Sequence, residues 1–315
     1  MSQNRRATLL LPAAERFGAQ RLGEAAAAAL GRADRMPAGE PGRCEQLLRH
    51  FEPTPRHWPI AALARQADAG DAAGSAWLRA DPVHIRPDIN GARLLAYGDA
   101  LGVDAEDRDA LLPALRPLFG DAGFPIDAPA PARWYLRLPR EAKLPDFADP
   151  AQALGEDVFE HLASGADGRR WRALSSEAQV VLHNHPWNAE RARLGRAPIN
   201  SLWFWGGGVL PERVASTHSA LHSDDESAVA LARPACAASA LPVRWIEPEG
   251  DAAFDLDGER DLARLQQDWL LPALASLAAG RIGALDIDLA DGRSYRFGRS
   301  QRWRFWRRPQ RRFGE

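Results

Sequence analysis

Hydrophobic and polar residues alternate along the chain with two different periods, which predict strands followed by helices. Residues 8–11 form a short apolar run typical of a buried strand, and the alanine-rich stretch 25–30 is a strong helix former. Further helices are expected at 43–51 and 60–66, separated by a segment rich in proline. The first part of the chain therefore predicts an α/β arrangement.

The middle of the chain continues this alternation. Residues 81–88 have the pattern of a buried strand that ends in a turn, and residues 133–138 alternate as a strand does. The stretch 104–115 starts with acidic residues, which suit the positive end of a helix dipole. A helix is expected from Ser175 to Leu182, with Ser175 as its start signal, and an apolar strand then runs from Ile199 into three glycines.

The last hundred residues predict a helix and a β-hairpin. Residues 260–279 form an amphipathic helical pattern with Gly280 as its C-cap. Two alternating stretches, 284–290 and 293–298, flank Asp291-Gly292, a dipeptide that favours a two-residue turn between strands.

Together these elements predict the α/β class, with a mixed sheet, flanking helices and a C-terminal helix and β-hairpin. We expect an α/β core at 1–213 and a C-terminal unit at 214–315 that packs on it. Because the N-terminus shows no export signal and Cys44 and Cys236 lie far apart, we expect no disulfide and a cytoplasmic location. No apolar run approaches the roughly 20 residues of a membrane span.

The net charge of the chain excludes few classes of function. The formal net charge of -2 argues against a globally basic nucleic-acid binder. Lys143 is the single lysine, so the other basic residues are arginines, and this compositional bias weakens an arginine count as evidence for phosphate binding.

The densest chemistry lies at 183–208, where histidines, asparagines and arginines precede a glycine run. A glycine loop after a buried strand brings backbone N–H groups close to an anion, although a tight turn is the simpler interpretation. His183 and His185 are separated by a single residue, so a shared zinc ion is an alternative to structural hydrogen bonding. The candidate ligand-binding residues in this segment are His183, His185, Asn188, Arg191, Asn200, Gly206 and Gly208.

This segment resembles a signature of the archaeal-type cofactor-independent phosphoglycerate mutases, and the resemblance extends over about residues 77–210. The matching positions are His185, Pro186, Asn188, Arg191, Gly195, Pro198, Asn200, Trp203, Trp205, Gly206 and Gly208. The resemblance implies a relic of the alkaline-phosphatase-like fold. Those enzymes hold two divalent metals with Asp and His and carry a serine nucleophile near an N-terminal Asp-Gly strand.

The chain departs from that pattern at its catalytic positions. Pro12 stands where a metal carboxylate is expected, and no Asp-x-x-x-His pattern follows the matched segment. Without metals, phosphoryl transfer lacks its main electrostatic stabilisation. The whole chain also resembles a small bacterial family labelled regulatory, associated with control of pathogenicity factors. We therefore expect no catalytic residues, no metal and no cofactor.

The arginine-rich segment 296–312 is the one charge cluster that stands out. It contains eight arginines and no acid, interleaved with Trp303, Phe305 and Trp306. Nucleic-acid binding is one interpretation, with Arg302, Trp303, Arg304, Arg307 and Arg308 as candidates. The favoured interpretation is a packed edge strand with Trp303 and Phe305 on the core face and the arginines outward.

The sequence thus predicts a non-catalytic regulatory or binding protein derived from a mutase-like ancestor. Its expected partner is a phosphorylated small molecule or an unidentified protein, with no membrane and no nucleic acid. A metal-dependent phosphate-ester enzyme with relocated ligands, and nucleic-acid binding through the arginine-rich segment, are the alternatives.

Overall fold

A computed structural model describes residues 5–89, 91–163 and 165–315. The contacts divide the chain into two compact units. Unit 1 contains the chain up to Arg56 together with Glu212–Glu315, and unit 2 is His57–Pro211. The first four residues of the N-terminal stretch considered for an export signal lie outside the described residues.

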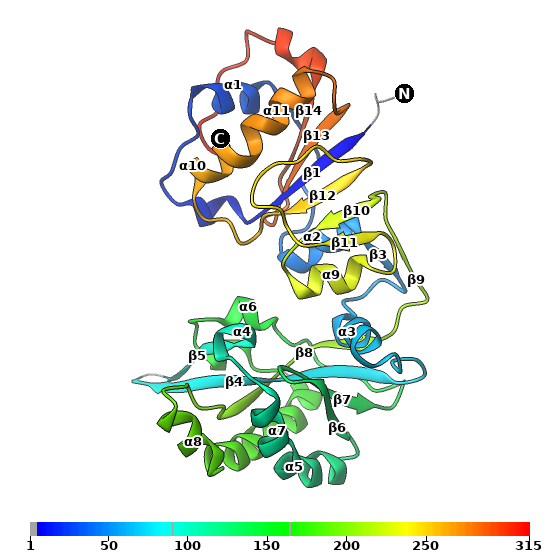
Figure 1. Cartoon of the computed structure of the whole chain (residues 1–315), viewed down its shortest axis with the longest axis vertical. Helices are drawn as coiled ribbons and strands as arrows, with labels where there is room; N and C mark the ends of the chain where they lie inside the picture. Colours follow the sequence, from blue (N-terminus) through cyan, green and yellow to red (C-terminus); the bar gives the residue numbers. More distant parts are fainter. Residues whose placement is uncertain (1–4, 90, 164) are drawn as a thin grey trace. The chain divides into compact units, whose positions relative to one another are not determined.

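Unit 1 is built on a sheet with strand order β11-β10-β12-β1-β13-β14-β2 (Figure 1). Its strands are β1 (Arg6–Leu11), β2 (Asp34–Arg35), β10 (Ala220–His222), β11 (Ala237–Ser239), β12 (Ala252–Asp255), β13 (Ala284–Leu289) and β14 (Ser294–Gly298). Parallel pairing joins β11, β10, β12, β1 and β13, and antiparallel pairing adds β14 and β2. The expected mixed sheet is therefore present.

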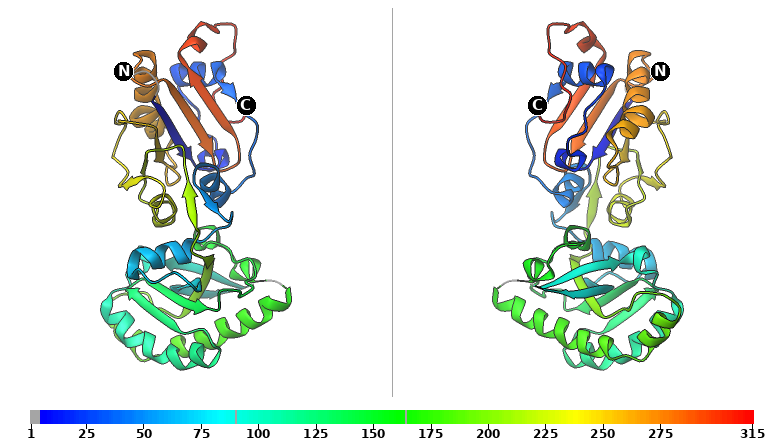
Figure 2. Two further views of the ribbon diagram at one scale, coloured as in Figure 1. Left: turned by 90° about the vertical axis from the view of Figure 1, so that its right-hand side faces the viewer. Right: turned by 90° about the vertical axis from the view of Figure 1, so that its left-hand side faces the viewer.

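Helices cover both faces of this sheet. They are α1 (Glu24–Arg32), α2 (Arg43–His50), α9 (Glu226–Ala232), α10 (Leu262–Leu265) and α11 (Leu271–Ala278), with a π-helical turn at Gln266–Leu270 and 3-10 turns at Ala14–Phe17 and Arg299–Trp303. Apolar residues of α1, α10 and α11 pack on one face. On the opposite face, Arg49 and His50 of α2 bond to the side chain of Asp288, which alternates along β13 with Ile287 and Leu289 of the apolar cluster. Figure 2 shows the sheet and its helices in two further views. A small ladder of β3 (Glu52–Thr54) and β9 (Arg213–Ala215) completes the unit.

The arrangement of β1 decides where the units divide. β1 pairs with β12 on one side and with β13 on the other, so the N-terminal strand lies inside a sheet made mainly by the C-terminal part of the chain. This division differs from the expected boundary after residue 213, because a boundary drawn along the sequence cannot separate strands that share one sheet.

Unit 2 has a second sheet in which β4 is central. The strand order is β5-β4-β7-β6, and β8 also pairs with β4. The strands are β4 (Ala76–Asp88), β5 (Gly91–Tyr97), β6 (Ile126–Ala130), β7 (Arg133–Leu138) and β8 (Ser201–Val209); the helices are α3 (Ile60–Ala69), α4 (Gly98–Leu101), α5 (Ala105–Asp121), α6 (Pro150–Ala153), α7 (Gly165–His183) and α8 (Trp187–Arg193), with a 3-10 turn at Val158–His161.

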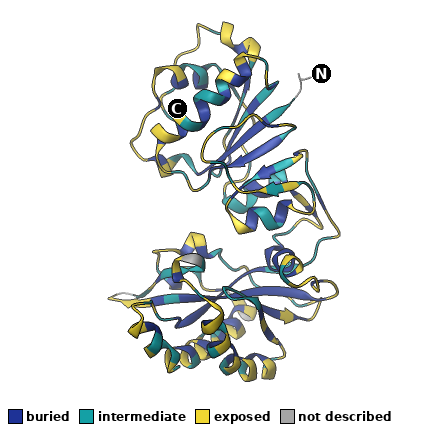
Figure 3. Ribbon diagram, in the orientation of Figure 1, coloured by how far each residue is buried: buried dark blue, intermediate teal, exposed yellow. Residues whose placement is uncertain are grey.

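One face of the unit 2 sheet packs against α5 and α7 through a large apolar cluster, and the other lies under α3. The strands are accordingly coloured mostly as buried in Figure 3. The expected helix start at Ser175 is wrong, because α7 begins at Gly165. Gly165 and Gly168 are weak helix formers, but Trp171 and Leu174 are buried in the cluster, and this packing extends the helix toward its N-terminus.

Candidate functional site

Two asparagines of the 183–208 segment bind backbone groups. Asn188 donates to the carbonyls of Leu182 (2.8 Å) and Ile199 (2.9 Å), and its Oδ1 accepts from the N–H of Ile199 at 2.9 Å. Asn200 accepts from the N–H of Ile85 at 2.9 Å and donates to its carbonyl at 2.7 Å, where the register of β4 shifts. These bonds hold the segment together, as its polar composition suggests.

Arg191 is fully buried and joins α8 to α5. Its guanidinium donates to the carboxylate of Asp107, to the carbonyl of Leu101 at 2.8 Å and to that of Ala197 at 2.8 Å. Asp107 also forms the capping box of α5 with Asp104. A buried charge needs such partners, so this ion pair stabilises the contact between the two helices.

The histidines of the segment are placed differently. His183 is exposed at the end of α7, whereas His185 is partly buried and its Nδ1 accepts from the backbone N–H of Trp187 at 3.2 Å. The geometry accounts for His185 as a structural hydrogen-bond partner. A ligand-binding role for either histidine stays a prediction.

The glycines of the segment lie inside β8, and the expected tight turn is wrong. The pairing of β4 with β8 shifts in register between Trp77 and Arg79 of β4, so β8 is irregular at its glycines. Gly206 has φ +64°, and a Cβ there would lie 3.3 Å from the Cβ of Ile60. A Cβ on Gly208 would lie 2.8 Å from the ring of His57. These glycines therefore permit a close approach of α3 and the residues before it.

The face under α3 carries a buried polar layer. Arg79 and Asp81 form an ion pair, with 2.8 Å between Nη2 and Oδ2, and both side chains are about 5% exposed. Trp205 donates from Nε1 to Asp81 at 2.7 Å, and the Arg79 guanidinium lies 5.4 Å from the ring centre of Tyr135. Burial raises the pKa of Tyr135 well above its usual range. This phenol is consequently a hydrogen-bond donor.

A second arginine lies in the same layer. Arg65 bonds to Asp71 and Asp127 at 2.6 Å each, and its guanidinium lies 4.6 Å from the ring centre of Trp77. The sequence analysis missed this layer, although the spacing of two of its residues indicates it. Arg79 and Asp81 are two residues apart in an apolar strand, so they lie on one face.

In unit 1, charged residues gather at the carboxyl ends of the parallel strands, where α/β sheets commonly bind ligands. Arg43 of α2 lies among three carboxylates. Its Nη2 is 2.5 Å from Asp255 and 3.1 Å from Asp225, and its Nε is 4.0 Å from Asp257. Ser223 donates to the same Asp255 oxygen at 2.6 Å. The guanidinium thus occupies the centre of the cluster.

The protonation of this cluster follows from its surroundings. Burial acts against the charge of Arg43, but the carboxylates outweigh it and raise the pKa of the guanidinium. Burial raises the pKa of Asp257. Asp225 also caps α9 by accepting from the N–H of Ser227 at 2.8 Å.

Asp288 of β13 begins a second buried chain of polar groups. It accepts two bonds from Arg49, at 3.1 and 2.6 Å, and lies 2.8 Å from Nε2 of His50. Nδ1 of His50 lies 3.0 Å from Nε2 of His218, whose own Nδ1 is buried without a partner. Although burial opposes it, bonding from His50 and Arg49 lowers the pKa of Asp288. Burial and His50 lower the pKa of His218 to about 4.

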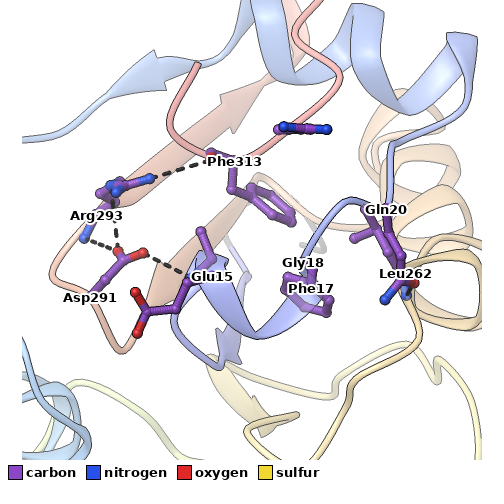
Figure 4. A pocket seen from close by; sticks show the side chains of 10 residues that line it. Glu15, Phe17, Gly18, Gln20, Leu262, Asp291, Arg293 and Phe313 are labelled. Atoms are coloured by element: carbon purple, nitrogen blue, oxygen red, sulfur yellow. Dashed lines mark hydrogen bonds and ion pairs between the residues drawn. The ribbon is translucent and has the colours of Figure 1, made fainter.

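A cavity of about 260 Å³ lies beside the turn after β1 (Figure 4). Phe17 and Phe313 line it, with ring centres 6.0 Å apart. Asp291 accepts from the backbone N–H of Arg293 at 3.0 Å, and Glu15 adds a second carboxylate to the rim. Since the rim carries both signs of charge, its chemistry selects no single class of ligand.

The arginine-rich segment differs from the expected packed strand. β14 ends at Gly298, and residues Arg299–Trp303 form a 3-10 turn. Trp303 and Phe305 are 66% and 79% exposed, so the expectation that they pack in the core is wrong. The reason is that β2, the edge partner of β14, pairs over only two residues, and no other strand in the described part of the chain continues the ladder beyond it.

Within residues 5–89, 91–163 and 165–315, no group of three or more His, Cys, Asp or Glu side chains is arranged to hold a metal ion. In the same ranges, no helix combines the length and apolar character needed to cross a bilayer.

Comparison with characterised proteins links part of the chain to one family of enzymes. No family model matches. A probable 2,3-bisphosphoglycerate-independent phosphoglycerate mutase of Geobacter sulfurreducens is 41% identical over 69 residues, which are 22% of this chain and 17% of that protein. The mutase of Methanosarcina mazei is 38% identical over 66 residues, 21% of this chain and 17% of the enzyme. The chain thus matches about a sixth of these relatives, and the similarity supports a phosphoglycerate-mutase-like ancestry.

Solved structures give broader but weaker matches. A cofactor-independent phosphoglycerate mutase from Thermoplasma acidophilum superposes with a TM-score of 0.43 and 16% identity, covering 93% of this chain and 89% of the enzyme. A protein from Pyrococcus horikoshii superposes with a TM-score of 0.46 and 10% identity, covering 94% and 88%. Neither superposition supports a conclusion about activity.

Proposed function

We propose that this chain is a non-catalytic regulatory or binding protein derived from a phosphoglycerate-mutase-like ancestor. One observation carries the proposal: Arg43 occupies the carboxylate cluster at the carboxyl ends of the unit 1 strands. The same proposal holds that the chain has lost the active site of its ancestor and that the unit 1 sheet has an alkaline-phosphatase-like origin.

The chemistry of phosphoryl transfer explains why this observation matters. Divalent metals neutralise the charge that develops on the transferred group and activate the nucleophile. At Asp255, one oxygen already accepts from Arg43 and from Ser223. At Asp288, Arg49 and His50 use both oxygens. A metal would have to displace these hydrogen-bonding side chains, and Pro12 after β1 supplies no carboxylate.

The expected ligand is a phosphorylated small molecule or a protein partner. The expected ligand-binding residues of unit 2 already bond to groups of that unit; they are Asn188, Arg191 and Asn200. Their role in a ligand site is therefore to hold the surrounding backbone in place. The competing hypothesis is a phosphate-ester enzyme with relocated metal ligands.

Activity and metal content test the proposal together. Purified protein is assayed with 3-phosphoglycerate and p-nitrophenyl phosphate, with and without Mn²⁺, and its metal content is measured by mass spectrometry. We expect no turnover above the blank and no stoichiometric divalent metal. Turnover that a chelator abolishes would refute the proposal.

A gain-of-binding variant sharpens this test. Arg43→Ala removes the cation from Asp225, Asp255 and Asp257, so Mn²⁺ should raise the melting temperature of the variant but not that of the wild type. Arg193→Ala, which loses only an exposed pair with Glu190, is the matched control and should not respond. Equal Mn²⁺ responses of wild type and Arg43→Ala would show that Arg43 does not block a metal.

A further inference from the structure

Three large aromatic side chains lie exposed within four residues of unit 1. The three residues are Trp303, Phe305 and Trp306, and the side chain of Trp306 is 68% exposed. They belong to the red segment of Figure 1 that follows β14. A gathering of exposed aromatic rings usually marks an interaction site.

Cations surround these rings. Arg296 pairs with Asp286, and Arg304 pairs with Asp34. Among the described residues, the other arginines from 299 to 308 form no ion pair; they are Arg299, Arg302, Arg307 and Arg308. The segment therefore offers four unpaired cations beside the rings and, since 296–312 contains no acid, matches a polyanion in charge.

The segment is anchored to the fold on both sides of the rings. Gln301 donates to Asp34 at 2.9 Å, and Arg304 donates to the carbonyl of Arg32 at 3.1 Å. Farther along, the N–H of Gln310 donates to a carbonyl of α1 at 2.9 Å. The rings are consequently presented by a fixed loop, which lowers the entropy cost of binding.

An apolar pocket of about 130 Å³ lies next to the segment, with Arg302 in its lining. Leu274, Leu277 and Phe297 line it, together with Arg32 and Arg302. The Arg302 guanidinium also lies 4.9 Å from the ring centre of Trp303, and the Nε of Arg32 is buried without a hydrogen-bond partner. An apolar cavity of about 150 Å³ accepts a benzene molecule, so this pocket suits one planar ring beside an unused donor.

We propose that residues 299–308 and the adjoining pocket bind single-stranded nucleic acid. From 302 to 308, cations and rings alternate almost residue by residue, as phosphates and bases alternate along a nucleotide strand. The Phe305 and Trp306 rings meet at 81°, so they form separate stacking surfaces and not one flat apolar face. A membrane anchor would need the rings together on one side, with the arginines above them.

Fluorescence anisotropy with a labelled single-stranded oligonucleotide of roughly 15 nucleotides tests the proposal. We expect binding at low salt with a log–log salt slope of about -3, since four contacted phosphates contribute about 0.7 each. The triple variant Trp303→Ala, Phe305→Ala, Trp306→Ala should bind at least tenfold more weakly with nearly the same slope. The double variant Arg307→Ala, Arg308→Ala should make the slope shallower by about 1.4.

Matched controls separate this surface from general effects. Phe159→Ala removes a ring that is 61% exposed in unit 2, and Arg140→Ala with Arg169→Ala removes two exposed cations there. These controls should bind like the wild type, and because the three rings are exposed, the ring variant should melt normally. Absence of binding at low salt, or wild-type affinity in the ring variant, would overturn the proposal. Binding to phosphatidylserine vesicles without binding to the oligonucleotide would replace it with a membrane surface.

Discussion

Replacing Arg43 by alanine is the most direct test of how the strand-end carboxylates are neutralised. The side chain of Asp255 is only 2% exposed and lies 2.5 Å from the guanidinium, so the variant leaves a buried carboxylate without its cation. Breaking a buried pair in this way costs about 3–5 kcal/mol. Asp225 and Asp257 are 40% and 34% exposed and can hydrate, so they add little. We therefore expect the free energy of unfolding to fall by about 3 kcal/mol at pH 7, the lower end of that range.

The pH dependence distinguishes this explanation from lost packing. In the variant, Asp255 stays buried but has lost its cation, so the folded state disfavours the charged form of this carboxyl group. Such a group is protonated without penalty below the unfolded pKa, and the penalty grows as pH rises through the folded pKa. The stability difference between wild type and Arg43→Ala should therefore be large at pH 7 and small near pH 4.

Urea unfolding at both pH values, combined with hydrogen exchange in β12 and β13, measures the change and assigns it to unit 1. Arg43→Lys keeps a cation and should lose less than Arg43→Ala. A loss below about 1 kcal/mol at pH 7, or an equal loss at pH 4, would refute the reasoning, because it would mean that Asp255 does not depend on Arg43.

Three further predictions concern stability. Asn200→Ala should lower the stability of unit 2 by about 1–3 kcal/mol, since buried backbone groups of β4 lose their partner, whereas exposed Asn184→Ala should be nearly neutral in thermal melts. Gly206→Ala should lower the stability by about 1–2 kcal/mol, because the φ of +64° strains any residue with a Cβ. Gly258→Ala is the control, and equal melting temperatures of the two variants would contradict the prediction. His218 has a pKa of about 4 when folded and about 6.5 when unfolded, so the wild type should lose up to about 3 kcal/mol as pH falls through this window; His218→Gln should lack that slope in urea titrations.

Local sequence chemistry determined most of the secondary structure. The apolar run at 8–11 is a buried strand, and the expected hairpin of β13 and β14 is present. The expected two-residue turn is wrong, because residues 290–293 connect the two strands and Gly292, not Asp291, has a positive φ. Asp104 caps α5 as the acidic start of that stretch indicates. These features depend on neighbours within a few residues, so the pattern alone suffices to predict them.

The candidate site was only partly visible in the sequence. The sequence indicated Asn188 and Asn200 as ligand-binding candidates, and the structure shows both bonded to backbone groups of unit 2, so a ligand-binding role for them stays a prediction. The cluster around Arg43 was missed, because its partners lie about 180 to 214 residues away and meet only where parallel strands end together. No local pattern can report a contact over such a separation.

Tertiary structure also reversed two expectations drawn from local pattern. Residues 302–306 alternate as a strand would, but β2 is too short to continue the ladder, so Trp303 and Phe305 face solvent. The glycines at 206–208 suggest a turn, yet they lie within β8. In both cases the sequence determined the local conformations that were available, and the neighbouring elements decided which one formed, because burial and pairing outweigh intrinsic preference.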